Sequence, residues 1–282
     1  MAIGKTQIPL LLLGASFSAS LQAAVNDLLP GDFSRPVKTF SFASVYLYER
    51  SSELVTNPSA RQKTGIRTVV LGHARNERTV LPHSISVSAS QLGVASNYGA
   101  TRLRDGIGDA KLSITVWPWS NDSWDQAIGL SHVFPTGDYD PKFTWNPGQN
   151  RHRSALTIAG AYRSDNTRLE QSVEFGQYQD NTRHGTSFST LSQTSTVAST
   201  SYLTVAAPQG WSYFVGYYLS RGGTLRVDDT ATGVDSAVSR GSLGMRFLAF
   251  GTGVTIRMVT DLERRSGSRL TREILLRAGV TF

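Results

Sequence analysis

Two residues in this chain have the types and the spacing of a nucleophile beside a general base. His152 and Ser154 are two positions apart, so in an extended strand both side chains point to the same face. A histidine can accept the proton of a serine hydroxyl when a third polar group orients the imidazole. The nearest downstream asparagine is Asn166, and a strand starting at this point would carry it to the far end, roughly 30–40 Å away. Asn146 or Asn150 would reach Ser154 only through folding of a loop, so we expect no catalytic residues and no enzyme.

Other kinds of chemistry have less support in the sequence. The histidines are scattered without close pairing or carboxylate spacing, so we expect no metal site. The chain has no cysteine, which excludes disulfides and thiolate nucleophiles. The segment 106–109 lacks the third glycine of a dinucleotide fingerprint, and we expect no cofactor. The formal charge is +7, but Lys and Arg do not cluster. This distribution argues against nucleic acid and favours outer-membrane lipid and lipopolysaccharide as partners.

The first 23 residues predict a cleaved secretory signal. Lys5 provides a positive start, residues 8–15 form an apolar core, and Ala23 is a small residue suited to cleavage. The apolar core is too short for a helix across ~30 Å of hydrocarbon, and no later segment is longer. We therefore divide the chain into a signal peptide at 1–23 and a β-barrel domain at 24–282, exported through the periplasm.

The mature part alternates between apolar and polar residues along most of its length. In the last segment, Ile274 and Leu276 share one face while Glu273 and Arg277 share the other. Charged residues are only 17% of the chain, which suits a wall with one lipid-facing side and one weakly polar side. A final Phe282 on the apolar row is typical of the signal for outer-membrane insertion. We therefore predict that Phe282 serves assembly through the barrel-assembly machinery.

Twelve segments show this alternation, and the connections between them alternate in length. Connections such as 119–125 and 207–210 are short, whereas 49–63 and 136–152 are long, and 263–270 is intermediate. Short periplasmic turns, long extracellular loops and an even strand count are typical of outer-membrane barrels. The sequence thus predicts an all-β, transmembrane, antiparallel up-and-down barrel of about twelve strands in the cell outer membrane. The predicted strands are residues 38–48, 64–75, 83–95, 108–118, 126–135, 153–163, 169–178, 195–206, 211–220, 239–249, 253–262 and 271–282.

The alternation also predicts which side chains line the lumen. Trp117, Phe214 and Tyr218 fall on the inward face, whereas Tyr46 and Tyr48 are expected in an aromatic girdle at the outer headgroup level. A lumen of mixed polarity is consistent with a narrow channel and equally with a barrel filled by its own side chains. Further residues expected to point inward are Arg67, Lys111, Arg153, Arg163, Arg246, Arg257, Arg277, Asp109, Glu170, Glu174, Asp261, Glu273, Val69, Leu71, Leu248, Val259 and Leu275.

Four motifs make this chain similar to a known family. They are residues 29–33 (LPGDF), 106–112 (GIGDAKL), 134–140 (FPTGDYD) and 146–151 (NPGQNR). Their order and spacing resemble the meta-pathway phenol-degradation outer-membrane β-barrel family over most of the mature chain. His152 departs from the pattern, since an aromatic residue such as Trp would be expected there. The resemblance implies a barrel that passes small hydrophobic compounds, and it transfers no binding residues.

The third and fourth motifs are expected to form one ordered outer loop. Prolines and glycines restrict and shape its backbone, and its acidic residues face Arg151 and Arg153 across the loop in sequence. The loop could fold into the lumen as a constriction, or over the rim for stability through turns and ion pairs. The residues that would shape an entrance are Asp138, Asp140, Asn146, Asn150 and Arg151.

Together these features predict a passive outer-membrane channel or transporter for small hydrophobic, possibly aromatic, compounds. Trp117, Phe214 and Tyr218 would offer contacts to the solute along the lumen. One alternative is a structural or surface-binding outer-membrane barrel whose lumen is plugged. An outer-membrane phospholipase is the third, least favoured, possibility.

Overall fold

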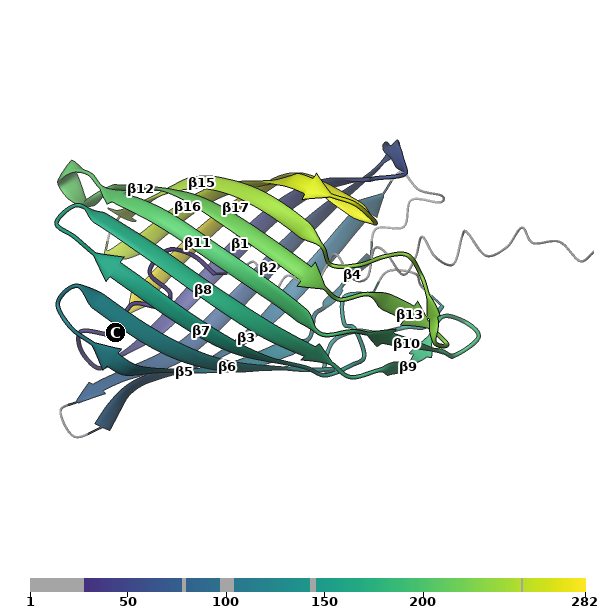
Figure 1. Cartoon of the computed structure of the whole chain (residues 1–282), viewed down its shortest axis with the longest axis horizontal. Coiled ribbons are helices and arrows are strands. Elements are labelled where there is room, and N and C mark those ends of the chain that lie inside the picture. The colour runs from purple at the N-terminus through teal and green to yellow at the C-terminus, as the bar shows by residue number, and fades with distance from the viewer. Residues whose placement is uncertain (1–27, 78–79, 97–103, 143–145, 250) are drawn as a thin grey trace, which may run out of the picture.

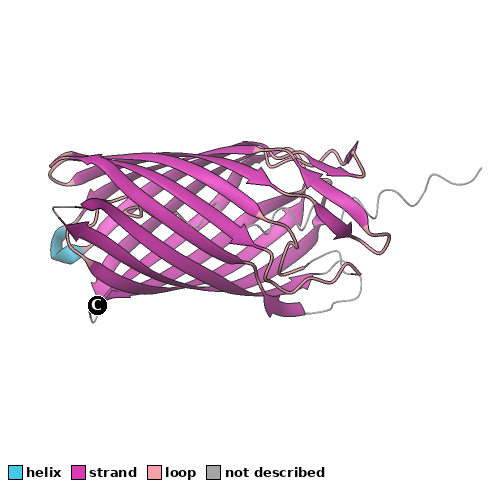
Figure 2. Ribbon diagram, turned by 90° about the horizontal axis from the view of Figure 1, so that it is seen from below, coloured by secondary structure: helices cyan, strands magenta, loops and turns pink. Residues whose placement is uncertain are grey.

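The alternating segments form long antiparallel strands that curl into a closed barrel in the computed structural model (Figures 1 and 2). The structure describes residues 28–77, 80–96, 104–142, 146–249 and 251–282. No helix in this part of the chain has the length and apolar character needed to cross a membrane. The predicted signal peptide lies outside the described residues.

Twelve strands build the barrel wall, and each is paired with its neighbours in chain order. The barrel closes where the last strand pairs with the first, and the second strand pairs with the third. All twelve predicted strands are confirmed, most of them within a few residues. The wall strands are β1 (Phe40–Leu54), β2 (Asn57–Glu77), β3 (Val80–Ser96), β5 (Ala110–Ser120), β6 (Trp124–Phe134), β7 (Arg153–Arg163), β8 (Thr167–Tyr178), β11 (Thr196–Ala206), β12 (Ser212–Gly222), β15 (Val238–Ala249), β16 (Thr252–Arg264) and β17 (Ser268–Thr281).

Short elements accompany the wall at both ends. A four-residue strand, β4 (Arg104–Ile107), pairs with β3 just before β5 begins. A separate small sheet gathers parts of two long loops at the end where the long connections lie (Figure 1). A 3-10 turn, η2 (Pro208–Gly210), occupies one of the short connections at the other end. The small sheet consists of β9 (Asn181–His184), β10 (Ser189–Gln193), β13 (Leu225–Val227) and β14 (Thr230–Ala231).

The alternation of loop lengths is correct at one end of the barrel and only partly correct at the other. The predicted long loops between β6 and β7, between β8 and β11, and between β12 and β15 are present. The predicted loop at 49–63 is instead a tight hairpin, because β1 and β2 stay paired to Leu54 and Asn57, with a shift of register after Glu53. The connection at 263–270 is also mostly strand. These strand extensions have polar residues on both faces, since they rise above the hydrocarbon and no longer face lipid. Alternation of apolar and polar residues therefore did not reveal them.

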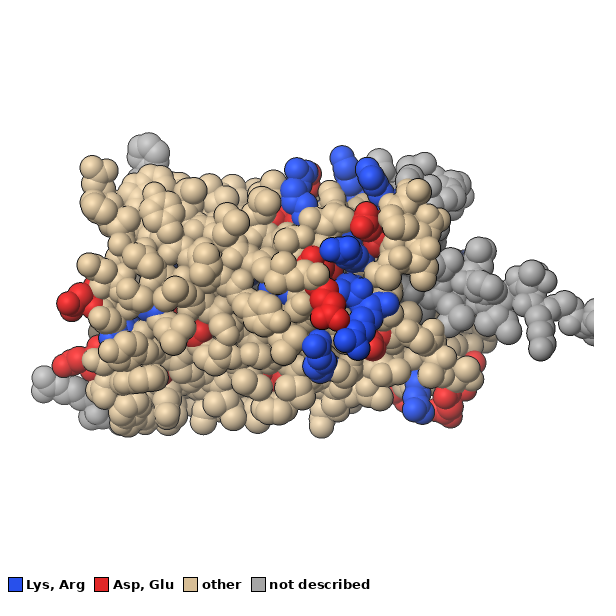
Figure 3. Space-filling view, turned by 45° about the horizontal axis from the view of Figure 1, so that its top comes forward, with Lys and Arg blue, Asp and Glu red and all other residues tan. Residues whose placement is uncertain are grey.

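The two faces of the wall differ as the barrel prediction requires. On β7, the side chain of Ile158 is 53% exposed, whereas Arg153 is 2% exposed and points inward. Figure 3 shows most of the charged side chains on the visible face gathered towards one end, beside a broad uncharged belt. Two exposed ion pairs lie at the outer end, at or just beyond the ends of β1, β16 and β17. They are Arg265–Glu263 and Arg272–Glu49. The belt is the lipid-facing surface, with charges kept at the outer headgroup level.

The predicted facing of the first two strands is wrong by one position. Val69 and Leu71 are 48% and 57% exposed on the outer wall, and Arg67 shares their face. Ile66 is buried inside, together with Tyr46 and Tyr48, which were expected in a girdle. In β2 small and polar residues alternate with apolar ones on both faces, so composition alone left the register ambiguous.

Inward glycines make room for inward aromatic rings on neighbouring strands. A Cβ on Gly216 would lie 2.3 Å from the ring of Tyr202, its cross-strand partner. A Cβ on Gly244 would lie 2.4 Å from the ring of Phe214, again directly across the strand pair. Tyr202 and Phe214 then meet edge to face at 5.7 Å. These pairs let large rings fill the narrow lumen without pushing the wall apart.

Deletion of Phe282 should lower the amount of folded barrel in the outer membrane. Its backbone N–H donates to the Ser41 carbonyl, and its carbonyl accepts from the Ser41 N–H, both at 2.9 Å, at the closing seam. The side chain is 78% exposed, so its loss creates no core cavity. We expect less heat-modifiable protein in membrane fractions, whereas Thr281→Ser should assemble normally. Normal folded levels after the deletion would contradict the assembly role.

Candidate functional site

The N-terminal segment before β1 lies inside the barrel. Leu29 is only 2% exposed and packs against Tyr46, Tyr48 and Leu275 of the inner wall. We call residues 28–36 the lumen segment. It contains the first family motif, residues 29–33, whose position inside the barrel could not be predicted from the sequence. The lumen is therefore partly filled by the chain's own N-terminal residues.

Hydrogen bonds to the wall hold the middle of the lumen segment. The Gly31 N–H donates to both carboxylate oxygens of Glu170, at 3.0 and 2.9 Å. The Leu28 carbonyl accepts from the Tyr202 hydroxyl at 2.8 Å and from the Arg257 guanidinium at 3.0 Å. Gly31 has a φ of +93°, a conformation open to glycine with little strain. The sharp turn lies between the contact to β8 and the contacts to β11 and β16, so one short segment bonds to several strands of the wall.

An ion pair adds to this anchoring. The Asp32 carboxylate accepts from Arg277 of β17 at 2.7 Å and also from the Leu29 N–H at 2.8 Å. The motif's proline and glycine thus shape the turn, while its aspartate ties the turn both to itself and to the wall. An Asp side chain closing a turn over its own backbone is a common local device.

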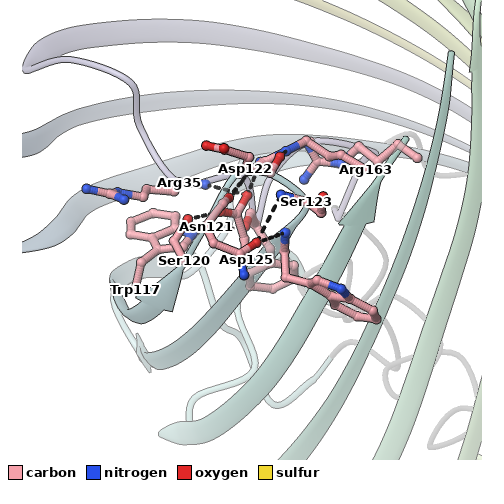
Figure 4. A network of polar contacts seen from close by, with 12 residues as sticks. Arg35, Trp117, Ser120, Asn121, Asp122, Ser123, Asp125 and Arg163 are labelled. Atoms are coloured by element: carbon pink, nitrogen blue, oxygen red, sulfur yellow. Dashed lines mark hydrogen bonds and ion pairs between the residues drawn. The ribbon is translucent and has the colours of Figure 1, made fainter. Parts of the chain in front are cut away.

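A polar network fixes the lumen segment near the short-turn end (Figure 4). The indole N–H of Trp117 donates to the Phe33 carbonyl at 2.9 Å, and the Arg35 N–H donates to Asp125 at 3.3 Å. Asp125 is 1% exposed and also accepts from Ser120 and from the guanidinium of Arg163. Trp117 was predicted to line the lumen, and the structure confirms its inward position. Its contact is the chain's own backbone.

A cavity of about 380 Å³ remains between the lumen segment and the wall. It lies in the half of the barrel with the short turns, since its lining includes the first residues of β1 and the last residues of β17. Serine and threonine side chains of β3 and β5 form one side, and aromatic rings form another. The aromatic lining residues are Phe33, Phe40, Phe42, Tyr46, Tyr48 and Trp117.

The other half of the lumen is packed with ion pairs. Glu273, 1% exposed, accepts from both Arg50 and Arg257. Arg240 pairs with Asp261 at 2.6 Å, and its guanidinium lies 5.5 Å from the ring centre of Tyr218. Charges removed from water are stable only when their partners are equally fixed. This layer therefore places buried, mutually paired charges in the half of the lumen towards the long-loop end.

Three of the family motifs meet around one carboxylate at that end. Asp109 accepts from the Gly137 N–H at 2.9 Å and from the Gln149 N–H at 2.8 Å. Gly137 and Gly148 approach so closely that a Cβ on either would lie 2.7 Å from neighbouring backbone. Burial raises the pKa of Asp109, and the two N–H donors and Arg151 partly offset that effect. The motif glycines are needed for close approach, and Asp109, which the alternation predicted to point inward, instead accepts hydrogen bonds from the loop backbone.

The predicted entrance residues lie in this folded loop and bond mainly to neighbouring segments of the loop end. The Asp138 carboxylate accepts from the Ile107 N–H at 2.7 Å, and the Asn146 side chain accepts from the Asp140 N–H at 2.8 Å. Asn150 donates to Asn181 of the small sheet at 3.0 Å. These contacts are those of an ordered cap, one of the two possibilities left open by the sequence.

The expected ion pairs across this loop are wrong. Arg153 points into the lumen and pairs with Glu174, while Arg151 donates to Gln149 and Gln193. Arg151 is 4% exposed and lies over the ring of Tyr178. Burial lowers the pKa of Arg151 to about 10, so it stays charged at neutral pH. The loop is long enough to be held from several sides, which spacing in sequence does not reveal.

Phe214 and Tyr218 of β12 point inward as predicted, with the inward Gly216 between them. Phe214 packs on Tyr202, and Tyr218 borders a small cavity of about 20 Å³ beside Leu28 and Arg257. The sequence pattern assigned no role to Tyr202, Leu28 or Leu29. The only sequence signal for their contact was the motif at residues 29–33, because a loop has no periodicity that predicts where it packs.

A closed twelve-stranded barrel with an uncharged belt defines an outer-membrane β-barrel protein. A family model described as "Putative MetA-pathway of phenol degradation" matches residues 76–262, and the chain belongs to this family. No curated protein sequence matches the chain significantly.

Solved structures confirm the fold. The COG4313 outer membrane channel from Pseudomonas putida F1 matches with a TM-score of 0.85 at 18% identity, over 91% of this chain and 100% of that one. The transport unit of the autotransporter AIDA-I from Escherichia coli matches with a TM-score of 0.51 at 9% identity, over 95% and 97%. At these identities the likeness establishes the architecture.

Replacing Asp109 with Asn should loosen the outer loop while the barrel stays folded. The amide group would set an N–H against one of the two backbone N–H donors, a loss of about 1–3 kcal/mol locally. We expect faster cleavage within residues 135–152 by protease added to intact cells. Asp165→Asn, in a short turn at the opposite end, is the matched control and should match the wild type. Unchanged cleavage in Asp109→Asn would show that the loop does not depend on this carboxylate.

Proposed function

We propose that this protein is a passive outer-membrane channel for small hydrophobic, including aromatic, compounds. We also propose that the protein reaches the outer membrane by export through the periplasm. The observation that carries the proposal is the cavity of about 380 Å³ beside the lumen segment, which is lined by aromatic rings together with serine, threonine and charged side chains. Because an apolar cavity of ~150 Å³ is enough for a benzene ring, this larger space of mixed polarity has room for a one-ring solute. Membership of a family described by phenol degradation, and the name of the COG4313 channel, support the same class of function.

In this proposal, the solute passes through rearrangement of groups inside the barrel. The lumen segment is held by hydrogen bonds along its length, by the Asp32–Arg277 ion pair and by the buried side chain of Leu29. Each net hydrogen bond contributes only ~0.5–1.5 kcal/mol, so parts of the segment can leave the wall one contact at a time. Trp117, Phe214 and Tyr218 would contact the solute, and the residues of the outer cap, Asp138 to Arg151, would shape its entry.

The rival proposal is a structural barrel that passes nothing. The ion-pair layer around Glu273 is the specific observation in its favour. The channel proposal requires no catalytic residue and no cofactor. Partners would be lipopolysaccharide, which suits the charged outer end, the barrel-assembly machinery and the solute itself.

Cells that contain the protein should take up labelled toluene or phenol faster than cells without its gene at low external concentration. Purified protein in planar bilayers should show small conductance steps. The gene should raise uptake of the aromatic solute more than uptake of a sugar of similar size. Unchanged uptake of every aromatic compound, together with no conductance, would favour the structural barrel.

Replacing Trp117 with Ala should increase conductance several-fold. The change removes the indole N–H that holds the Phe33 carbonyl and widens the cavity end of the lumen. Trp124→Ala is the matched control, because Trp124 is 46% exposed on the outer wall of the next strand. Heat-modifiability should confirm that both variants fold. Equal conductance of the two variants would place the resistance elsewhere in the barrel.

A further inference from the structure

Three polar side chains form a hydrogen-bonded chain on the outer wall of the barrel. The Ser154 hydroxyl oxygen lies 2.9 Å from Nδ1 of His132, and Nε2 of His132 lies 2.9 Å from Nδ1 of His152. In one tautomer, His132 accepts the hydroxyl proton at Nδ1 and donates its own N–H to His152. This is the order of nucleophile, general base and orienting group found in serine hydrolases.

The cluster faces the membrane. Leu130 and Leu156, which share the outward face with His132 and Ser154, are 59% and 38% exposed. Ser154 is the second residue of β7, and His132 is the third residue from the end of β6, so both lie at the long-loop end. This level corresponds to the outer edge of the hydrocarbon, where lipid ester groups meet the acyl chains.

A polar row at this level is unusual for a lipid-facing wall. Uncompensated polar groups in hydrocarbon are unfavourable, and such residues are commonly functional. The three side chains satisfy one another but leave the serine hydroxyl exposed. His132 is also fixed by an edge contact with the ring of Phe134, at 4.6 Å between centres. The base is thus held on two sides while the nucleophile remains accessible.

An amide donor and an apolar groove flank the serine. In the sheet register, Ser154 lies directly between His132 on β6 and Gln177 on β8. The side-chain N–H groups of Gln177 are suited to stabilise an oxyanion next to the serine. Ser154 and Gln177 both line an open outer groove of about 490 Å³. Its apolar lining residues are Leu112, Ile114, Ala155, Leu130, Leu156 and Phe175.

We propose that Ser154, His132 and His152 form a serine esterase site that cleaves acyl esters of outer-membrane lipid. Ser154 Oγ attacks the ester carbonyl carbon while its proton moves to His132, and Gln177 donates to the oxyanion. The ester C–O bond breaks, and the leaving alcohol takes the proton from His132. Water, deprotonated by His132, then attacks the acyl-serine ester and releases the fatty acid, which restores the Ser154 hydroxyl.

This site differs from the enzyme considered from the sequence. The sequence offers His152 beside Ser154 with Asn166 as the nearest downstream asparagine, and Asn166 lies in the β7–β8 turn at the opposite end of the barrel. The base is His132, from the preceding strand, which antiparallel register places opposite Ser154. The expected absence of catalytic residues gives way here to a site on the outer wall, separate from the lumen.

The test uses the purified full-length barrel in detergent micelles and in phospholipid vesicles. A fluorophosphonate probe should label Ser154, located by mass spectrometry, and vesicle lipid should release fatty acid. Ser154→Ala should abolish both signals, and His132→Gln should lower the hydrolysis rate by ~10²–10⁴. Ser201→Ala is the matched control, since Ser201 is an outward serine of β11 whose hydroxyl donates to Gln171. Heat-modifiability should show that each variant is folded.

Absence of both labelling and hydrolysis in the wild type would overturn the proposal. Hydrolysis by Ser154→Ala at the wild-type rate would overturn it as well, because the activity would then belong to another group or a contaminant. Toluene uptake by cells carrying Ser154→Ala separates this site from the channel. Uptake at the wild-type level with no hydrolysis is the expected result, and loss of uptake in a folded variant would contradict a site independent of the lumen.

Discussion

Hydrogen bonding of the backbone inside hydrocarbon is the constraint on which the rest of this structure depends. No water is available there, so every strand N–H and carbonyl needs a partner in a neighbouring strand, and the sheet must close. Closure is completed by β1 with β17, where thirteen residue pairs form with one shift of register after Ser51, and by β2 with β3. A closed wall then fixes one face of each strand towards lipid and the other towards a narrow interior. The sequence pattern of the whole chain follows from that division.

The interior has become a core made largely of charged and aromatic groups. Arg50, Arg257 and Glu273 share one buried cluster, and Arg240 with Asp261 forms another. Inward glycines beside Tyr202 and Phe214 let rings cross the lumen without widening the barrel. The lumen segment completes this core by offering backbone groups to residues such as Glu170 and Trp117. Polar contacts of this kind define one arrangement more sharply than apolar contacts would, because a misplaced charge has no alternative partner.

The two proposed activities use opposite faces of the same wall. The cavity depends on inward residues and on the lumen segment, whereas the serine cluster depends on outward residues of β6, β7 and β8. Strand alternation separates them, since Arg153 points inward to Glu174 and the adjacent Ser154 points outward to His132. A barrel wall is one residue thick, so neighbouring residues can serve unrelated environments without interfering with one another.

The sequence by itself determined the barrel class, the twelve strands and the inward positions of Trp117, Phe214 and Tyr218, because a period of two repeats wherever one face meets lipid. It misplaced the facing of β2, where both rows are small or mixed, and it overestimated the loop after β1, where apolar rows end but pairing continues. Only the tertiary structure placed the lumen segment inside the barrel, gathered three motifs around Asp109 and set His132 opposite Ser154. Those contacts join residues from 22 to 245 positions apart in the chain. They follow from register and loop docking, which local periodicity does not encode.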